Sequence, residues 1–365
     1  MPLKCGIIGL TNVGKTTIFN CISNTKAQAT NFAFSTNKSN MGIVAVPDER
    51  LFVLEKMVKA AKVVTATIEI VDIPGLAKGA SKGEGIGNAF LADIRQTDAV
   101  IHVLRCFDDA ELPHIEGSID PVRDKEIIDF ELQLKDLEQI EKKLQKVEKL
   151  ASTGDKDAKK TAEILKHYKN HIESFQNVRT IDLNDEDKKT VKDMCLLTEK
   201  PVLYVCNVNA DSAVNGNDYV KNFEEAIKNE DAEMIVIAGA LESEIAELDN
   251  PDDRLAFLKD VGLTGPGVNK LVRSAFKLLK LKTFFTAGPK EARSWTIKEG
   301  MNAQQSAGVI HSDLERGFIR AEVMKYADFV ELGSEVACKE KGKLYVEGKN
   351  YIVDDGDILN IRFNV

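Results

Sequence analysis

The sequence predicts an α/β fold that begins with a phosphate-binding loop, continues into a helical hairpin and ends in a separate β-rich region. Three observations carry this prediction. Apolar, β-branched runs alternate with helical patterns, two stripes of apolar residues at spacings of three and four follow the third run, and glycine-punctuated short strands close the chain. A length of 365 residues favours two or three units, each with its own core.

The strands expected in the main sheet are short runs rich in Val and Ile. Because they alternate with helical segments, they indicate parallel βαβ construction. The expected strands are Lys4 to Gly9, Thr67 to Ile73, Ala99 to Phe107, Val202 to Val208 and Met234 to Ala238.

Two amphipathic helices are expected between the third and fourth strands, over 130–147 and 158–175, with a polar turn at 152–155. Their spacing predicts an antiparallel hairpin, and periodicity alone leaves open whether it projects as an arm or packs flat. After a helix-like segment over 269–281, glycines punctuate the remaining short strands, at Gly300, Gly308, Gly317, Gly333, Gly342, Gly348 and Gly356. We therefore expect a nucleotide-binding domain over 3–280, interrupted by the hairpin at 125–200, and a β-rich domain over 281–365.

Composition restricts the partners and the compartment. A formal net charge of −9 gives no chain-wide basic field, so DNA is not expected and any RNA contact must be local. The strongest basic run is either an RNA footprint or a solvated face. No apolar stretch is long enough for a membrane span and no signal peptide is recognised, so we expect a cytoplasmic protein. The basic run named above as an RNA footprint or a solvated face comprises Lys277, Lys280, Lys282, Lys290 and Arg293.

The strongest motif is G-x-x-x-x-G-K-[ST] over 9–16, placed directly after a strand and before a helix. The glycines let successive backbone N–H groups face phosphate oxygens at the positive end of a helix dipole. Lys15 is expected to reach the β- and γ-phosphates, and the Thr16 hydroxyl to bind Mg²⁺, which prefers hard oxygen ligands. The expected nucleotide contacts of this loop are Asn12, Val13, Gly14, Lys15, Thr16 and Thr17.

A second element, Asp72-Ile73-Pro74-Gly75, ends the second expected strand. Asp72 can hold Mg²⁺ through water, Gly75 can sense the γ-phosphate, and Thr36 can complete the metal shell from a mobile first switch. Leu76 stands where many GTPases carry a water-orienting glutamine. Hydrolysis is therefore expected to be slow or to recruit another group; His114 is our catalytic candidate, and a loop histidine without such a role is the alternative.

The residues at the end of the fourth expected strand argue against selectivity for guanine. Guanine-specific NTPases carry an N-K-x-D element, whereas the fourth strand here ends in Asn207-Val208-Asn209-Ala210. Adenine offers a donor and an acceptor that the Asn207 amide and backbone groups near Val208 could match. Asp211, one position further on, would restore guanine recognition if the loop shifted.

These residues identify the chain as similar to the YchF family, the Obg-like ATPases of the Obg branch of translation-factor GTPases, over nearly its whole length. The resemblance lies in 9–17 (GLTNVGKTT), 31–36 (NFAFST), the glycine-rich 72–91, 105–107, 207–209 and the closing 355–365. It implies ATP hydrolysis, Mg²⁺ held by positions matching Thr16 and Thr36, and a base pocket around Val208. The family usually carries Glu where Ala210 stands, which leaves the details of that pocket open.

The resemblance further implies a coiled-coil arm for the hairpin, a TGS-like β-grasp domain at the C-terminus and association with the ribosome, as the large subunit or the 70S particle, with ribosomal RNA within reach. It also supports His114, because related proteins place a histidine after the Arg-Cys-Phe stretch. By analogy with related NTPases, Asn12 suggests K⁺ dependence.

The leading functional hypothesis is a Mg²⁺-dependent ATPase switch whose nucleotide state changes how it meets a ribosome. Two alternatives stay open: a scaffold that binds ATP as a ligand with incidental hydrolysis, and a switch that uses GTP. A small-molecule P-loop kinase ranks below them, because the D-x-x-G element has no use in that chemistry.

Overall fold

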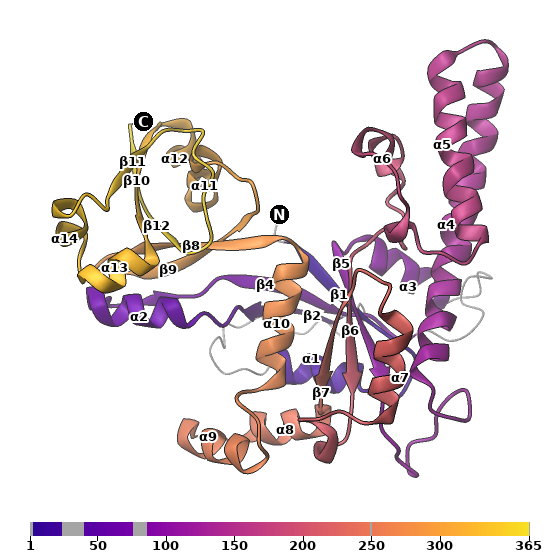
Figure 1. Ribbon diagram of the computed structural model, residues 1–365, viewed down its shortest axis with the longest axis horizontal. Helices are drawn as coiled ribbons and strands as arrows, with labels where there is room; N and C mark the ends of the chain where they lie inside the picture. Colours follow the sequence, from indigo (N-terminus) through magenta and orange to yellow (C-terminus); the bar gives the residue numbers. More distant parts are fainter. Residues whose placement is uncertain (1–2, 24–39, 76–85, 249, 365) are drawn as a thin grey trace. The chain divides into compact units, whose positions relative to one another are not determined.

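The computed structural model describes residues 3–23, 40–75, 86–248 and 250–364, which divide into two compact units (Figure 1). The first comprises 1–42 and 69–271, and the second 43–68 and 272–365. The sequence predicted a division at 280/281, which lies within ten residues of the second boundary. It did not predict that 43–68 belongs with the C-terminal region.

The first unit is built on a six-stranded sheet in the order β2-β4-β1-β5-β6-β7. β1 pairs in parallel with β4 and β5, β5 with β6, and β6 with β7, which confirms the predicted βαβ construction. Every residue of the central strands β5 and β6 is buried, as expected for a sheet covered by helices on both faces. The strands are β1 (Lys4–Ile8), β2 (Asn40–Ala45), β4 (Thr67–Asp72), β5 (Ala99–Arg105), β6 (Val202–Asn207) and β7 (Glu233–Ile237).

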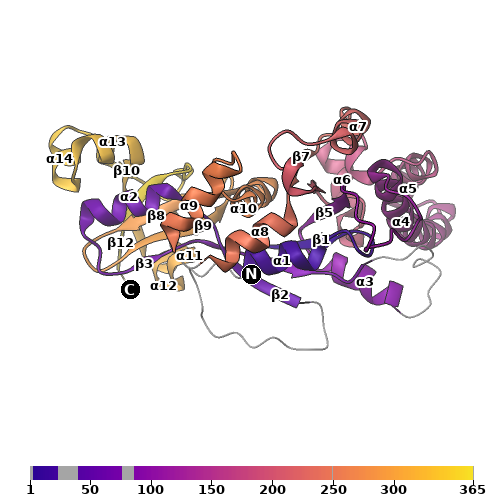
Figure 2. The ribbon, with the colours of Figure 1, turned by 90° about the horizontal axis from the view of Figure 1, so that it is seen from below.

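Helices of the first unit connect these strands and lie to either side of the sheet (Figure 2), whereas α10 spans the boundary between the two units. Among the described residues, no helix is both long and apolar enough to cross a membrane. The shorter connecting helices are α1 (Lys15–Ser23), α3 (Ile86–Arg95), α6 (Asp185–Val191), α7 (Asp218–Ile227), α8 (Gly239–Glu247), α9 (Pro251–Asp260) and α10 (Gly267–Leu278).

The predicted helical hairpin is formed by α4 (Pro121–Ser152) and α5 (Lys156–Glu173). Asp120 caps α4 by accepting from two backbone N–H groups, and Gly154, at φ 99°, turns the chain before Asp155 caps α5 in the same way. A core led by Ile140, Leu165 and Tyr168 holds the helices together. They lie side by side in both views and extend past the edge of the sheet (Figures 1 and 2).

The second unit has a six-stranded mixed sheet in the order β11-β10-β12-β8-β9-β3. Consecutive residues Phe284 and Phe285 on β8 are both fully buried, each in a different core cluster, because neighbouring side chains of a strand point to opposite faces. The strands are β3 (Val63–Val64), β8 (Leu281–Ala287), β9 (Ala292–Lys298), β10 (Phe318–Lys325), β11 (Tyr345–Glu347) and β12 (Asp357–Phe363).

Helix α2 (Glu49–Val58) explains why 43–68 belongs to this unit. Leu51 and Leu54 are fully buried and pack in the cluster that contains Phe285, while β3 pairs in parallel with β9. The unit also contains four short helices that the glycine pattern did not predict. These are α11 (Ala303–Ile310), α12 (Ser312–Arg316), α13 (Tyr326–Leu332) and α14 (Glu335–Glu340).

Candidate nucleotide site

The predicted phosphate-binding loop joins β1 to α1 in the first unit. Gly9 at φ 152° and Gly14 at φ 94° adopt backbone conformations that favour glycine. A Cβ at Gly9 would overlap the Val103 carbonyl oxygen, and one at Gly14 would overlap the Asn207 amide nitrogen. Neither position can carry a side chain without moving the backbone or the amide, so the two motif glycines are required by packing as well as by φ.

Lys15 is the first residue of α1, and only 7% of its surface is exposed. Its ammonium donates to the Leu10 carbonyl at 2.5 Å, inside the loop. Burial lowers the pKa of Lys15 to about 8, and the negative charge of Asp72 acts in the opposite direction. A buried cation with one neutral hydrogen-bond partner is electrostatically poised for an anion such as a phosphate.

Thr16 and Asp72 meet as the motifs predicted. The Thr16 hydroxyl donates to Asp72 Oδ2 at 3.0 Å, which joins the start of α1 to the end of β4. The other carboxylate oxygen, Oδ1, is buried and has no hydrogen-bond partner within the described part of the chain, and burial raises the pKa of Asp72. An unpaired carboxylate oxygen beside a hydroxyl is a donor set that suits Mg²⁺.

Mg²⁺ would depend on the nucleotide as well as on the protein. Across the described ranges, no group of three or more His, Cys, Asp or Glu side chains is arranged to hold a metal ion. Mg²⁺ commonly binds through one or two protein oxygens plus phosphates, and that arrangement fits Thr16 and Asp72. Thr36, the third expected ligand, lies outside the described residues.

Gly75 approaches the phosphate-binding loop closely. A Cβ there would lie 3.0 Å from Lys15 Nζ and 3.0 Å from Thr11 Cγ2. The backbone of the D-x-x-G element is therefore next to the cation expected to hold the γ-phosphate, as a sensor of that phosphate requires. Leu76, which follows, lies outside the described residues.

The Asn207 side chain was expected to contact the base, but it bonds to two backbone groups instead. Its Nδ2 donates to the Val13 carbonyl at 2.9 Å, and its Oδ1 accepts from the Gly239 N–H at 2.9 Å. Both ends of the buried amide are occupied, so it connects the phosphate-binding loop to the start of α8 and is not free to read a base. Gly239 was missed by sequence reasoning, although a glycine between a strand and a helix could have drawn attention to it.

The expected base-reading segment follows Asn207. Val208 is buried and its N–H donates to the Ile237 carbonyl at 2.9 Å, whereas Ala210 and Asp211 are exposed in a 3₁₀ turn, Ala210–Ser212. The backbone N–H of Val208 is therefore also occupied. The segment places an alanine and not a carboxylate at the position that would read guanine, as the sequence indicated.

The Arg-Cys-Phe stretch shapes the loop that follows β5. Arg105 is 1% exposed, and its guanidinium donates to the carbonyls of Phe107, Asp109 and Leu112 while lying 4.6 Å over the Phe107 ring. A buried guanidinium satisfied by three carbonyls fixes the path of the loop. The role of Arg105 is to hold the segment that leads to His114, which sequence reasoning did not recognise.

His114 is held by hydrogen bonds at both ring nitrogens. Nδ1 accepts from the Glu116 N–H at 3.1 Å, so the proton is assigned to Nε2, which donates to Asp124 Oδ2 at 2.8 Å. The imidazole is 3% exposed, and burial raises the pKa of Asp124. In this arrangement His114 anchors the loop to the first turn of α4, and orienting a water molecule would require it to leave these partners.

Asn12 connects the two halves of the site. It has a left-handed φ of 63°, and its side-chain amide donates to the Pro113 carbonyl at 3.4 Å. The phosphate-binding loop thus contacts the residue that precedes His114.

Comparison with known proteins places the chain in a family. A model described as "50S ribosome-binding GTPase" matches 4–150, and one described as "Protein of unknown function (DUF933)" matches 281–364. The chain is 47% identical to proteins named ribosome-binding ATPase YchF from Pasteurella multocida and Bacillus subtilis, covering all of this chain and all of each relative. The chain belongs to the YchF family. The solved Schizosaccharomyces pombe YchF structure is 35% identical, covers 99% of this chain and 98% of its own, and gives a TM-score of 0.89.

The names of these YchF proteins differ in the nucleotide. The bacterial relatives are named ATPases, whereas the Schizosaccharomyces pombe protein is named a GTPase. Family membership therefore supports nucleoside-triphosphate hydrolysis, while the geometry around Val208 bears on the choice of base.

Proposed function

We propose that this chain is a Mg²⁺-dependent ATPase that acts as a conformational switch on the ribosome, on the large subunit or the 70S particle. One observation carries the enzymatic part: the buried Lys15 and Asp72 meet the hydroxyl of the exposed Thr16, and one Asp72 oxygen has no hydrogen-bond partner among the described residues. The ribosomal part is supported by the full-length relatives, which are named ribosome-binding ATPases.

Each residue of the site has a defined task in this proposal. The Lys15 ammonium exchanges the Leu10 carbonyl for the β- and γ-phosphates, and backbone N–H groups of 12–17 bind the phosphate oxygens. Mg²⁺ would neutralise charge that develops on the phosphates, with Thr16 and Asp72 as protein ligands, Asp72 acting through water. Gly75 reports the γ-phosphate to the switch segment that follows it.

Adenine is the proposed base because the site lacks the carboxylate that guanine's two donors require. Ala210 stands at that position, and Val208 replaces the lysine that would lie over the base. The Asn207 amide is committed to Val13 and Gly239, so base contacts must come from other backbone groups.

Competitive titration of ATP and GTP against the purified protein, with and without ribosomes, tests base choice and partner together. ATP should bind more tightly than GTP, and ribosomes should co-sediment with the nucleotide-bound protein. A GTP affinity equal to or above that for ATP would exclude the adenine assignment and favour a GTP-using switch, in line with the name of the Schizosaccharomyces pombe protein.

Several finer assignments belong to the same proposal. The α4–α5 hairpin acts as a coiled-coil arm, the C-terminal region is a TGS-like β-grasp domain, and the chain is a cytoplasmic member of the Obg branch. K⁺ bound near Asn12 would supply positive charge at the phosphates, and equal turnover in K⁺ and Na⁺ buffers would remove that idea. A mutant that binds but cannot hydrolyse ATP, if fully functional, would favour the scaffold alternative.

A further inference from the structure

The far end of the α4–α5 hairpin carries a concentration of positive charge that the nucleotide site does not explain. The stretch 142–169 contains nine lysines against four acidic residues, a net charge of +5, in a chain whose overall formal charge is −9. Five of these lysines form ion pairs with carboxylates, most of which lie outside this stretch, so the positive charge that is free to attract a polyanion lies on the other four.

The ion pairs of the hairpin separate these lysines into two groups. Five are paired with carboxylates on the hairpin itself or on the segment around α6, at distances between 2.6 and 3.6 Å. Four have no ion pair or hydrogen bond to their ammonium groups anywhere in the described residues, and all four are exposed. The paired group is Lys142, Lys143, Lys160, Lys166 and Lys169.

The four unpaired lysines are Lys146, Lys149, Lys156 and Lys159, which we call the tip lysines. They flank the turn at 153–155, two on the last turns of α4 and two on the first turn of α5. In each pair the lysines are three positions apart, so they are neighbours on one face of their helix. The turn therefore gathers four lysines without ion pairs, beside the carboxylates of Asp155 and Asp157, at the end of a hairpin that extends past the sheet (Figure 1).

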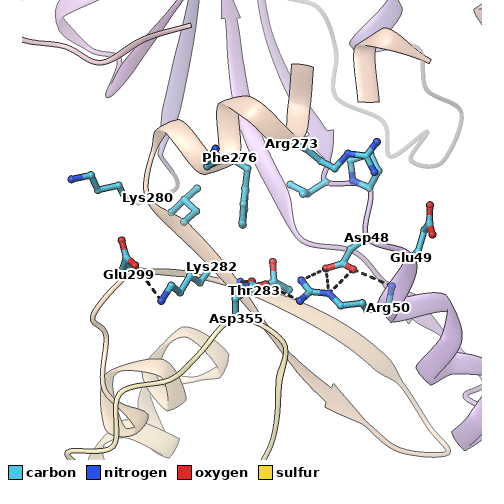
Figure 3. A pocket seen from close by; sticks show the side chains of 14 residues that line it. Asp48, Glu49, Arg50, Arg273, Phe276, Lys280, Lys282, Thr283, Glu299 and Asp355 are labelled. Carbon is cyan, nitrogen blue, oxygen red and sulfur yellow. Dashed lines mark hydrogen bonds and ion pairs between the residues drawn. The ribbon is translucent and has the colours of Figure 1, made fainter. Parts of the chain in front are cut away.

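The basic run that the sequence offered as an RNA footprint or a solvated face is compensated in part by acidic residues. A hollow of about 770 Å³ in the second unit is lined by five cationic and four acidic side chains (Figure 3). Lys282 is paired there with Glu299 at 3.2 Å, and Arg50 is bound by two carboxylates. Outside the hollow, the Arg293 guanidinium lies 3.9 Å over the Trp295 ring. This run offers a polyanion less free positive charge than the tip lysines do.

The composition of the tip distinguishes RNA from a protein partner. Interface cores between proteins are depleted in lysine and enriched in aromatic residues and arginine, and the tip carries neither an aromatic side chain nor an arginine. Its one large exposed apolar side chain is Leu150, at 57% exposure. Lysine ammonium groups serve as point charges for phosphates, and four of them can contact a backbone without base recognition.

We propose that the tip lysines bind the phosphate backbone of RNA on the ribosome surface, independently of base sequence. This inference rests on the proposed ribosome association and adds to it the contacting surface and its chemistry. Binding at the tip releases counterions, so its strength must fall steeply with salt.

The test uses the full-length protein, purified ribosomes and a labelled 16-base-pair RNA duplex as probes. The tip variant carries Lys146→Gln, Lys149→Gln, Lys156→Gln and Lys159→Gln; glutamine has a helix propensity close to that of lysine, so the hairpin should persist. The matched control removes four exposed lysines of the second unit that likewise have no ion pair among the described residues. These are Lys298, Lys339, Lys341 and Lys349.

Dissociation constants are measured between about 50 and 200 mM salt, together with ATP turnover and a thermal melt. With both probes, the tip variant should bind more weakly, and its slope of log K against log salt should become shallower by about 3 if all four lysines contact phosphates. The control variant should match the wild type, and all three proteins should hydrolyse ATP equally.

Different outcomes would contradict RNA binding by the tip lysines and the proposed ribosome association. Wild-type affinity and slope in the tip variant, or an equal loss in the control, would overturn the inference alone. A loss of ribosome binding with unchanged binding to the RNA duplex would identify an acidic protein as the partner and also overturn it. Failure of the wild-type protein to bind ribosomes would overturn the proposed function together with the inference.

Discussion

Because the Lys15 ammonium is buried, we expect the affinity for the nucleotide to depend on pH, and the pKa of Lys15 sets the direction. In the free protein the pKa of Lys15 is about 8, because burial disfavours its charge. Phosphates next to it favour the charged form, so binding raises the pKa and takes up a proton. Affinity is therefore highest below pH 8 and is lost as the pH rises through that value. Between pH 7 and pH 9 the dissociation constant should rise about tenfold, or about 1.4 kcal/mol.

Isothermal titration calorimetry at pH 9, in two buffers with different ionisation enthalpies, measures this proton directly. About 0.9 proton should be taken up per ATP bound at pH 9, and about 0.1 at pH 7. The control is Lys15→Arg, whose guanidinium does not titrate in this range, so its affinity should be independent of pH. A wild-type affinity that is equal at pH 7 and pH 9, or an arginine variant with the same pH dependence as the wild type, would refute the reasoning.

Three further substitutions test other parts of the site. Asn207→Ala leaves two buried backbone groups without partners and should lower the free energy of unfolding by about 2–4 kcal/mol, as measured by urea denaturation; a loss below about 1 kcal/mol would contradict the bridging role. Gly75→Ala places a methyl group 3.0 Å from the Lys15 ammonium and should slow steady-state ATP turnover by at least about tenfold, while ADP affinity stays within about threefold of wild type. His114→Ala should slow single-turnover hydrolysis by about 10²-fold, whereas Asp124→Asn, which weakens the hold on the ring, should not; an unchanged rate in His114→Ala excludes the catalytic role.

The sequence predicted the strands and the phosphate-binding loop, because these features depend on residues close together in the chain. The five expected strands are present within one or two residues at each end, because alternation of apolar runs with helices leaves few arrangements other than a parallel sheet. The phosphate-binding loop was equally predictable, since the φ values of Gly9 and Gly14 are requirements of the loop itself. The meeting of Thr16 with Asp72 followed from the neighbouring positions of β1 and β4.

Features that depend on distant partners were not predictable from one sequence. Helix α2 joins the C-terminal unit because Leu51 packs beside Phe285, more than two hundred residues away, and no local pattern encodes that choice. Asn207 was expected to face a base, yet its amide is occupied by backbone groups from two other segments. Arg105 is followed by Asp108 and Asp109 in the sequence, yet its guanidinium bonds to backbone carbonyl groups, a role that no side-chain pattern shows.

The position of His114 sets a condition on any link between hydrolysis and the hairpin. Contacts run from Asn12 through the Pro113 carbonyl to His114, and from its ring to Asp124 in the first turn of α4, the helix that carries two of the tip lysines. Both ring nitrogens are engaged there, so the imidazole cannot orient water and anchor α4 at the same time. If His114 is catalytic, the anchored and hydrolysis-competent states exclude each other, so ribosome binding that favours one of them shifts their populations and changes the hydrolysis rate. Equal hydrolysis rates with and without saturating ribosomes would show that these contacts only hold the loop in place.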